Sequence, residues 1–106
     1  MDAPIFVALA DPMRRQLLAT LAEDGPKTAT QLATEYPITR QAILKHLAIL
    51  AAANLVTIQQ QGREKRYTLT PEPLIEVEAW IKTISTTWET RLLRLKALLE
   101  TQEEEG

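Results

Sequence analysis

The chain contains no cysteine, a single histidine and only three glycines. Without cysteine it can form no disulfide, no thiolate metal site and no cysteine nucleophile. One histidine gives little basis for a Ser-His-Asp triad, and no glycine-rich phosphate loop is present. We therefore expect a protein that is not an enzyme, with no catalytic residues, no cofactor and no bound metal.

Long hydrophobic runs are also missing. No apolar stretch approaches about 18 residues, so we expect no membrane span. The N-terminus lacks the basic patch and apolar core of a secretory signal, which predicts a cytoplasmic protein. At 106 residues the chain has the length of a single domain, 1–106. The scarcity of glycine and the Glu/Leu/Ala-rich segments predict a mostly α fold.

The acidic net charge of −2 hides an uneven distribution along the chain. Residues 38–70 carry five Lys or Arg side chains against Glu64 alone, whereas residues 71–106 carry four against eight acidic ones. The field at a contact surface matters more for binding than the total charge. The middle of the chain is therefore the candidate for contact with a polyanion such as DNA.

Beyond an apolar helix at 2–10, two short helices are predicted before this basic segment. Asp11 is a good N-cap, and Pro12 fits the first position of a helix that runs to about Ala22. Thr28 can cap a second helix, with Gln31 three residues later in the capping-box position.

Residues 39–53 have the pattern of a third, amphipathic helix. Thr39 can cap its N-terminus, and Asn54 can adopt the left-handed conformation that ends a helix. Apolar residues spaced three or four apart form the predicted buried stripe of Ile43, Leu47 and Leu50. Gln41, Leu44 and Lys45 lie on the opposite side, with Arg40 at the leading edge. Arginine suits guanine and glutamine suits adenine in the major groove, so DNA contact is favoured.

A basic-tipped hairpin is predicted next. Residues 55–58 and 66–69 have strand propensity, and the segment around Gly62 turns between them. The charges beside this turn are Arg63, Lys65 and Arg66. They could protect an exposed edge strand from pairing with another chain, but contact with phosphates or the minor groove is the favoured interpretation. A three-helix core with a two-stranded wing is the outline of a winged helix-turn-helix, here a DNA-binding core at 11–70 with the wing at 55–70.

Residues 74–100 are predicted to form one long amphipathic helix, whose apolar residues recur every three or four positions. Its stripe leaves too much apolar surface for a small monomer, and the apolar helix at 2–10 has too little polar face to stand alone. We expect a homodimer in which both act as dimerisation helices. The candidate interface residues are Ile5, Phe6, Val77, Trp80, Ile81, Ile84, Trp88, Leu92, Leu95 and Leu99. A ligand pocket lined by the two tryptophans is the less favoured alternative.

Four segments together carry a family resemblance: ALADPMRRQLLATL (8–21), TATQLA (28–33), PITRQAILKHLAIL (37–50) and NLVTIQQQGREKRYTL (54–69). In order and spacing they resemble the ArsR-type winged-helix transcriptional repressors. The resemblance implies a homodimer, paired through its first and last helices, that binds a two-fold operator in double-stranded DNA. It places Thr39, Arg40, Gln41, Leu44 and Lys45 on the recognition helix and Arg63, Lys65 and Arg66 on the wing.

The chain departs from the metal-sensing members of that family. Those members carry paired cysteines in the helix before the recognition helix, or His and Asp ligands on the last helix. Residues 27–36 have no cysteine and the last helix has no histidine, so metal sensing is not expected and the inducer is unassigned. His46 beside the buried stripe is interpreted as a packed histidine rather than a ligand or proton switch. The alternative function is a winged-helix protein-interaction module without DNA binding.

Overall fold

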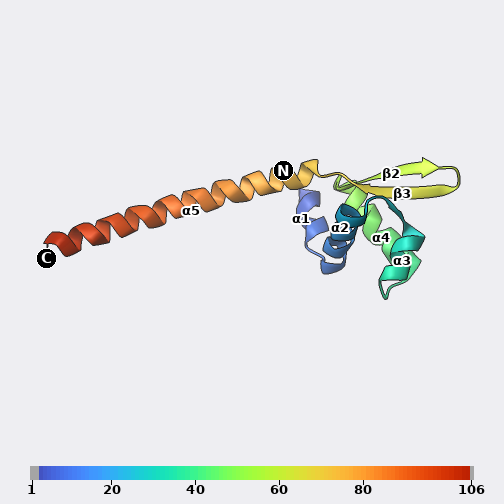
Figure 1. Cartoon of the computed structure of the whole chain (residues 1–106), viewed down its shortest axis with the longest axis horizontal. Helices are drawn as coiled ribbons and strands as arrows, with labels where there is room; N and C mark the ends of the chain where they lie inside the picture. The colour runs from blue at the N-terminus through green and yellow to red at the C-terminus, as the bar shows by residue number, and fades with distance from the viewer. Residues whose placement is uncertain (1–2, 106) are drawn as a thin grey trace. The chain divides into compact units, whose positions relative to one another are not determined.

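The computed structural model describes the backbone of residues 3–105 and the side chains of residues 3–101. Its elements, in chain order (Figure 1), are α1 (Ala3–Leu9), α2 (Pro12–Asp24), β1 (Lys27–Thr28), α3 (Ala29–Glu35), α4 (Arg40–Ala52), β2 (Val56–Gln61), β3 (Glu64–Leu69) and α5 (Glu72–Glu105). The chain divides into two compact units, Met1–Leu74 and Ile75–Gly106. The first unit holds the four short helices and the sheet, and the second is most of α5.

The predicted helix caps are confirmed. The Asp11 carboxylate accepts from the backbone N–H of Arg14 at 3.1 Å, and Thr39 accepts from Ala42 N at 3.1 Å. Thr28 and Gln31 form the reciprocal capping box at the start of α3. These bonds satisfy N–H groups that have no partner within a helix. The α2 helix continues to Asp24, slightly beyond the predicted end near Ala22, and Gly25 follows it with φ 83°.

The end of α4 also follows the prediction. Asn54 has φ 58°, the left-handed conformation that stops a helix and that asparagine tolerates better than most residues. The predicted stripe of Ile43, Leu47 and Leu50 is fully buried, and each has an exposed fraction of 0%. Burying one such side chain stabilises the fold by about 1.5–3 kcal/mol, so this face fixes how α4 is rotated in the first unit.

The sheet has three antiparallel strands in the order β1-β3-β2, whereas the sequence predicted only the hairpin. The missed strand β1 pairs Lys27 with Tyr67 and is only two residues long, too short to show any alternation. The hairpin strands reach Gln61 and Glu64, so they are longer than the predicted 55–58 and 66–69. Gly62 begins the turn with φ 61°, the conformation that a two-residue hairpin turn requires at that position.

A buried arginine joins the first two helices. Arg14, only 9% exposed, donates from Nε to Ala8 O at 2.9 Å and from Nη2 to Val7 O at 2.8 Å. Both carbonyls belong to the last turn of α1, where few backbone N–H groups remain as donors; Val7 O also accepts from Ala10 N at 3.3 Å. Arg14 also lies 4.0 Å from Asp11 Oδ2, so its charge is compensated. No sequence pattern predicted this contact, because arginine is seldom buried.

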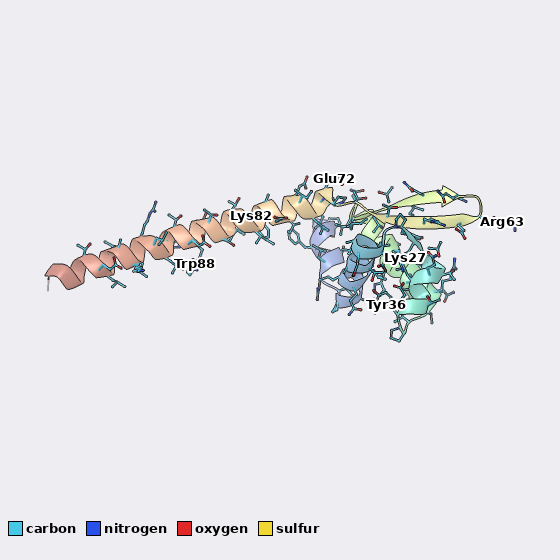
Figure 2. The ribbon with its side chains drawn as sticks, viewed as in Figure 1. Lys27, Tyr36, Arg63, Glu72, Lys82 and Trp88 are labelled. Carbon is cyan, nitrogen blue, oxygen red and sulfur yellow. The ribbon has the colours of Figure 1, made fainter. Side chains whose placement is uncertain are left out.

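The α5 helix begins at Glu72 and continues to Glu105, beyond the predicted 74–100. At about 1.5 Å per residue, its 34 residues span about 51 Å. Most of its described side chains are exposed, including Trp88, labelled in Figure 2. Among residues 3–105, no helix is long and apolar enough to cross a bilayer.

Candidate nucleic-acid interface

The exposed face of α4 carries the predicted recognition residues. Thr39, Gln41 and Lys45 are exposed, and Leu44 is half-buried. Thr39 caps the helix, and Gln41, Leu44 and Lys45 lie on the side away from the fully buried stripe, so rotation of α4 cannot bring these three inward without exposing that stripe. The face therefore offers amide and ammonium donors around one apolar side chain, a combination suited to base edges and to the thymine methyl group.

The turn between α3 and α4 is anchored to α2. Tyr36, at the end of α3, donates its hydroxyl to Gln16 O at 3.2 Å and shares a short hydrogen bond with the hydroxyl of Thr20. These contacts tie the α3–α4 turn to the buried part of the first unit, so both helices present their exposed ends from one rigid support.

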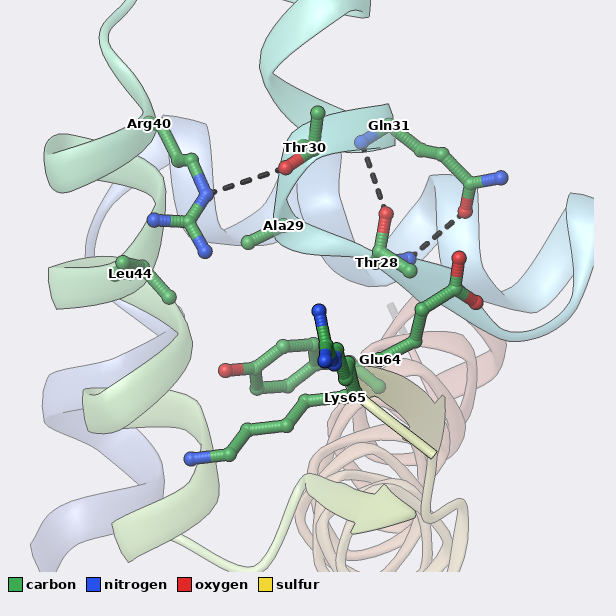
Figure 3. Close-up of a pocket in the computed structure, with 10 residues that line it drawn as sticks. Thr28, Ala29, Thr30, Gln31, Arg40, Leu44, Glu64 and Lys65 are labelled. Atoms are coloured by element: carbon green, nitrogen blue, oxygen red, sulfur yellow. Dashed lines mark hydrogen bonds between the residues drawn. The ribbon is translucent and has the colours of Figure 1, made fainter. Parts of the chain in front are cut away.

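Arg40 takes a different course from the other residues of α4. Its Nε donates to Thr30 Oγ1 on α3 at 3.2 Å, the dashed line at the left of Figure 3. The guanidinium is thereby turned toward α3 and the cavity beside it. The sequence grouped Arg40 with Gln41 as a possible base contact, and it contained no signal for the bond to Thr30.

A cavity of about 610 Å³ lies between α3, α4 and the hairpin (Figure 3). Its charged lining consists of Arg40, Arg63 and Lys65 with Glu64 as the one carboxylate, and the remaining lining residues are Thr28, Ala29, Thr30, Gln31, Leu44 and Tyr67. Three cations against one anion give this hollow a positive potential. It can accept an anionic group that approaches between the recognition helix and the wing.

The three wing cations do not share one environment. Arg63 is in the two-residue turn at the tip of the hairpin (Figure 2), and Lys65 lines the cavity. Neither forms an ion pair with a described side chain. Arg66 instead lies 3.4 Å from Glu64 Oε2, its Nε is buried without a hydrogen-bond partner, and strand alternation puts it on the face opposite Lys65.

His46 is half-buried, and its Nδ1 lies 3.4 Å from Arg14 Nη1. This contact fits the interpretation of a packed histidine. Among the residues that the structure describes, no group of three or more His, Cys, Asp or Glu side chains could hold a metal ion.

The predicted dimer residues differ in exposure. Ile5 is 6% exposed and Val77 is 9% exposed, so both side chains are largely buried within the protomer. The remaining residues are 41–58% exposed, and they are Phe6, Trp80, Ile81, Ile84, Trp88, Leu92, Leu95 and Leu99.

Comparison with known proteins places this geometry in a family. A helix-turn-helix domain model matches residues 9–59. The chain is 40% identical to the uncharacterized HTH-type transcriptional regulator YuzN of Bacillus subtilis, over 74% of this chain and 92% of that one. It is 31% identical to the transcriptional repressor SdpR of Bacillus subtilis, over 73% and 84% of the two chains.

A solved structure of an ArsR-like transcriptional regulator from Rhodococcus sp. RHA1 superposes with a TM-score of 0.84 and 36% identity, covering 93% of this chain and 90% of that chain. The chain belongs to the ArsR family of helix-turn-helix transcriptional regulators. The family confirms the predicted winged helix-turn-helix fold and the predicted DNA-binding transcriptional repressor. Because ArsR-family proteins are regulators rather than enzymes, it also confirms the prediction of a non-enzyme.

Proposed function

We propose that this ArsR-family regulator acts in the cytoplasm as a homodimeric repressor that binds a two-fold operator in double-stranded DNA. One observation carries the proposal: the exposed polar face of α4 adjoins a hollow whose cations are largely without carboxylate partners. By contrast, Lys27 at the start of the sheet is paired with both Asp24 and Glu35. Unmatched positive charge beside a recognition helix is what a polyanionic partner requires.

The dimer is supported by the apolar stripe of α5. Its members recur every three or four residues from Ile81 to Leu99 and are about half exposed. Phe6 of α1, 41% exposed, adds to the apolar surface. Such a stripe is larger than a monomer of this size normally exposes, and a second copy presents the same surface for self-complementary pairing. Two copies would also present two α4 helices, which matches a two-fold operator.

Within the DNA contact, we assign sequence reading to Gln41 and Lys45, with Leu44 packing on a thymine methyl group. Thr39 lies at the N-terminus of α4, where it can reach the backbone. We assign the wing residues Arg63 and Lys65 to phosphates, which position a protein without reading sequence. Arg66 is a weaker candidate for a phosphate contact than Arg63 or Lys65, because Glu64 already compensates part of its charge. The inducer, if regulation requires one, is not assigned.

An electrophoretic shift with DNA from upstream of the chain's own gene tests the proposal. The variant Gln41→Ala plus Lys45→Ala should lose binding to the operator while its melting temperature changes little, because both side chains are exposed. The matched control is Gln16→Ala plus Lys82→Ala, which removes the same residue types from α2 and α5 and should bind normally. A Gln41/Lys45 variant that binds like the parent would show that α4 is not the recognition helix.

A further inference from the structure

We propose that Arg40, held by Thr30, forms with Lys65 a site for one backbone phosphate of the operator, and that Arg40 does not read a base. This inference rests on the proposed function, since it requires α4 and the wing to lie on DNA. It divides the surface into a sequence-reading part, Gln41 and Lys45, and a positioning part inside the cavity.

The first support is the direction of the Arg40 side chain. Arg40 is the first residue of α4, from which an extended arginine could project its planar fork into the groove. Instead its Nε donates to Thr30 Oγ1 at 3.2 Å, and its terminal nitrogens line the cavity between α3 and the hairpin (Figure 3). A bidentate guanine contact would require the fork to leave this cavity and the bond to Thr30 to break.

The second support is a second cation, Lys65, in the lining of the same cavity. Lys65 comes from β3, on the other side of the cavity, and it forms no ion pair with any described side chain. Arg40 and Lys65 thus face the same cavity from separate elements. The one carboxylate in its lining, Glu64, lies 3.4 Å from Arg66 and pairs with neither of them. Like charges held near each other are stabilised by an anion between them, and DNA supplies phosphates at regular intervals.

The third support is the hydrogen-bonding capacity of the site. Thr30 Oγ1 accepts from Arg40 Nε and retains its own O–H to donate. The terminal nitrogens of Arg40, the ammonium of Lys65 and this hydroxyl are all donors, whereas a phosphodiester offers two oxygens that only accept. A base edge mixes donors and acceptors, so a cluster of these three donors fits phosphate better.

The test compares binding to the operator and to a scrambled duplex. Arg40→Gln should weaken both by the same factor, about tenfold or more for a lost charged hydrogen bond. It should also reduce the slope of log affinity against log salt by about 0.9 per subunit. Gln41→Ala is the matched control from the next position: it should weaken binding to the operator alone by about tenfold or more, and so relax the preference for the operator over the scrambled duplex.

Two further variants probe the site itself. Thr30→Val keeps the shape and the β-branch of the side chain, and it should weaken binding to both duplexes about fivefold. In the Arg40→Gln background its effect should be smaller, because the arginine that Thr30 holds is already gone and only the hydroxyl's own bond to the phosphate is left to lose. Thermal melting of each variant checks that it remains folded.

A neutral methylphosphonate placed at each operator position in turn identifies the phosphate. At one position the neutral group should weaken the binding of Arg40→Gln less than that of the wild type, because the variant has already lost its Arg40 contact to that phosphate. If no position is coupled to Arg40, or if Arg40→Gln relaxes sequence preference as Gln41→Ala does, the phosphate assignment is wrong. A wild-type protein that binds no upstream DNA would instead contradict the proposed function.

Discussion

Changing one leucine of the α5 stripe to glutamate should abolish the homodimer, and the same change at the next residue should not. Leu92 belongs to the stripe and is 46% exposed, whereas Leu93 is 66% exposed and lies about 100° further around the helix. Leu92→Glu and Leu93→Glu introduce the same charge on the same element. They differ only in the face of α5 that carries the charge.

The expected loss follows from the exposure of Leu92. Burying a whole leucine stabilises by about 1.5–3 kcal/mol, so covering the exposed half contributes about 1 kcal/mol per subunit and about 2 kcal/mol per dimer. Each glutamate also places an unpaired charge in an apolar interface, at a penalty of several kcal/mol. A total of at least about 4 kcal/mol raises the dimer Kd about a thousandfold.

Sedimentation equilibrium across the micromolar range measures this Kd. The wild type and Leu93→Glu should sediment as dimers, and Leu92→Glu should sediment as a monomer that binds a two-fold operator weakly. Equal dissociation of the two glutamate variants would show that the stripe does not define the interface. A wild type that sediments as a folded monomer would refute the dimer altogether.

Two predictions concern stability. Arg14→Met should lower the free energy of unfolding by about 2–4 kcal/mol in chemical denaturation, because two carbonyls of α1 each lose a charged donor. Arg15 is exposed, so the control Arg15→Met should lower it by under about 1 kcal/mol. Equal losses in the two variants would exclude a structural role special to Arg14. The backbone N–H of Arg14 lowers the pKa of Asp11, so this carboxylate stabilises the fold above its unfolded pKa, and the contribution is lost as the pH falls through the lower folded value. Asp11→Asn, which can still cap α2, should therefore lose less stability than the wild type between about pH 6 and about pH 3. Melting temperatures that fall by the same amount with pH in the two proteins would contradict this.

The helix boundaries were predictable because their signals are local. Asp11, Thr28 and Thr39 each accept a hydrogen bond from a backbone N–H three residues later, so a few neighbouring letters contain the whole interaction. Asn54 is similar, since its left-handed conformation depends on its own side chain and on the helix that it ends. The buried stripe of α4 was predictable for the same reason, because helical periodicity is a property of one segment.

The missed features depend on pairs that are distant in the sequence. Strand β1 exists because Lys27 meets Tyr67, forty positions away, and two residues alone have no strand pattern. The bond from Arg40 to Thr30 joins two helices whose packing is decided by other residues. Arg14 reaches the last turn of α1 only because Asp11 and Pro12 start a new helix that folds back on it. Tertiary packing determines these contacts, so no local pattern contained them.

The charges of the candidate interface were likewise only partly predictable from the sequence. Five cations against one carboxylate between residues 38 and 70 pointed to DNA, yet these charges are not equivalent. Glu64 compensates part of the charge of Arg66, and the same pairing removes that carboxylate as a competitor for Lys65 across the strand. Glu64 also lines the cavity, but because its carboxylate is engaged by Arg66 it neutralises little of the charge of Arg40, Arg63 and Lys65 there. The wing cations that share the cavity with Arg40 are therefore the ones placed to hold a phosphate.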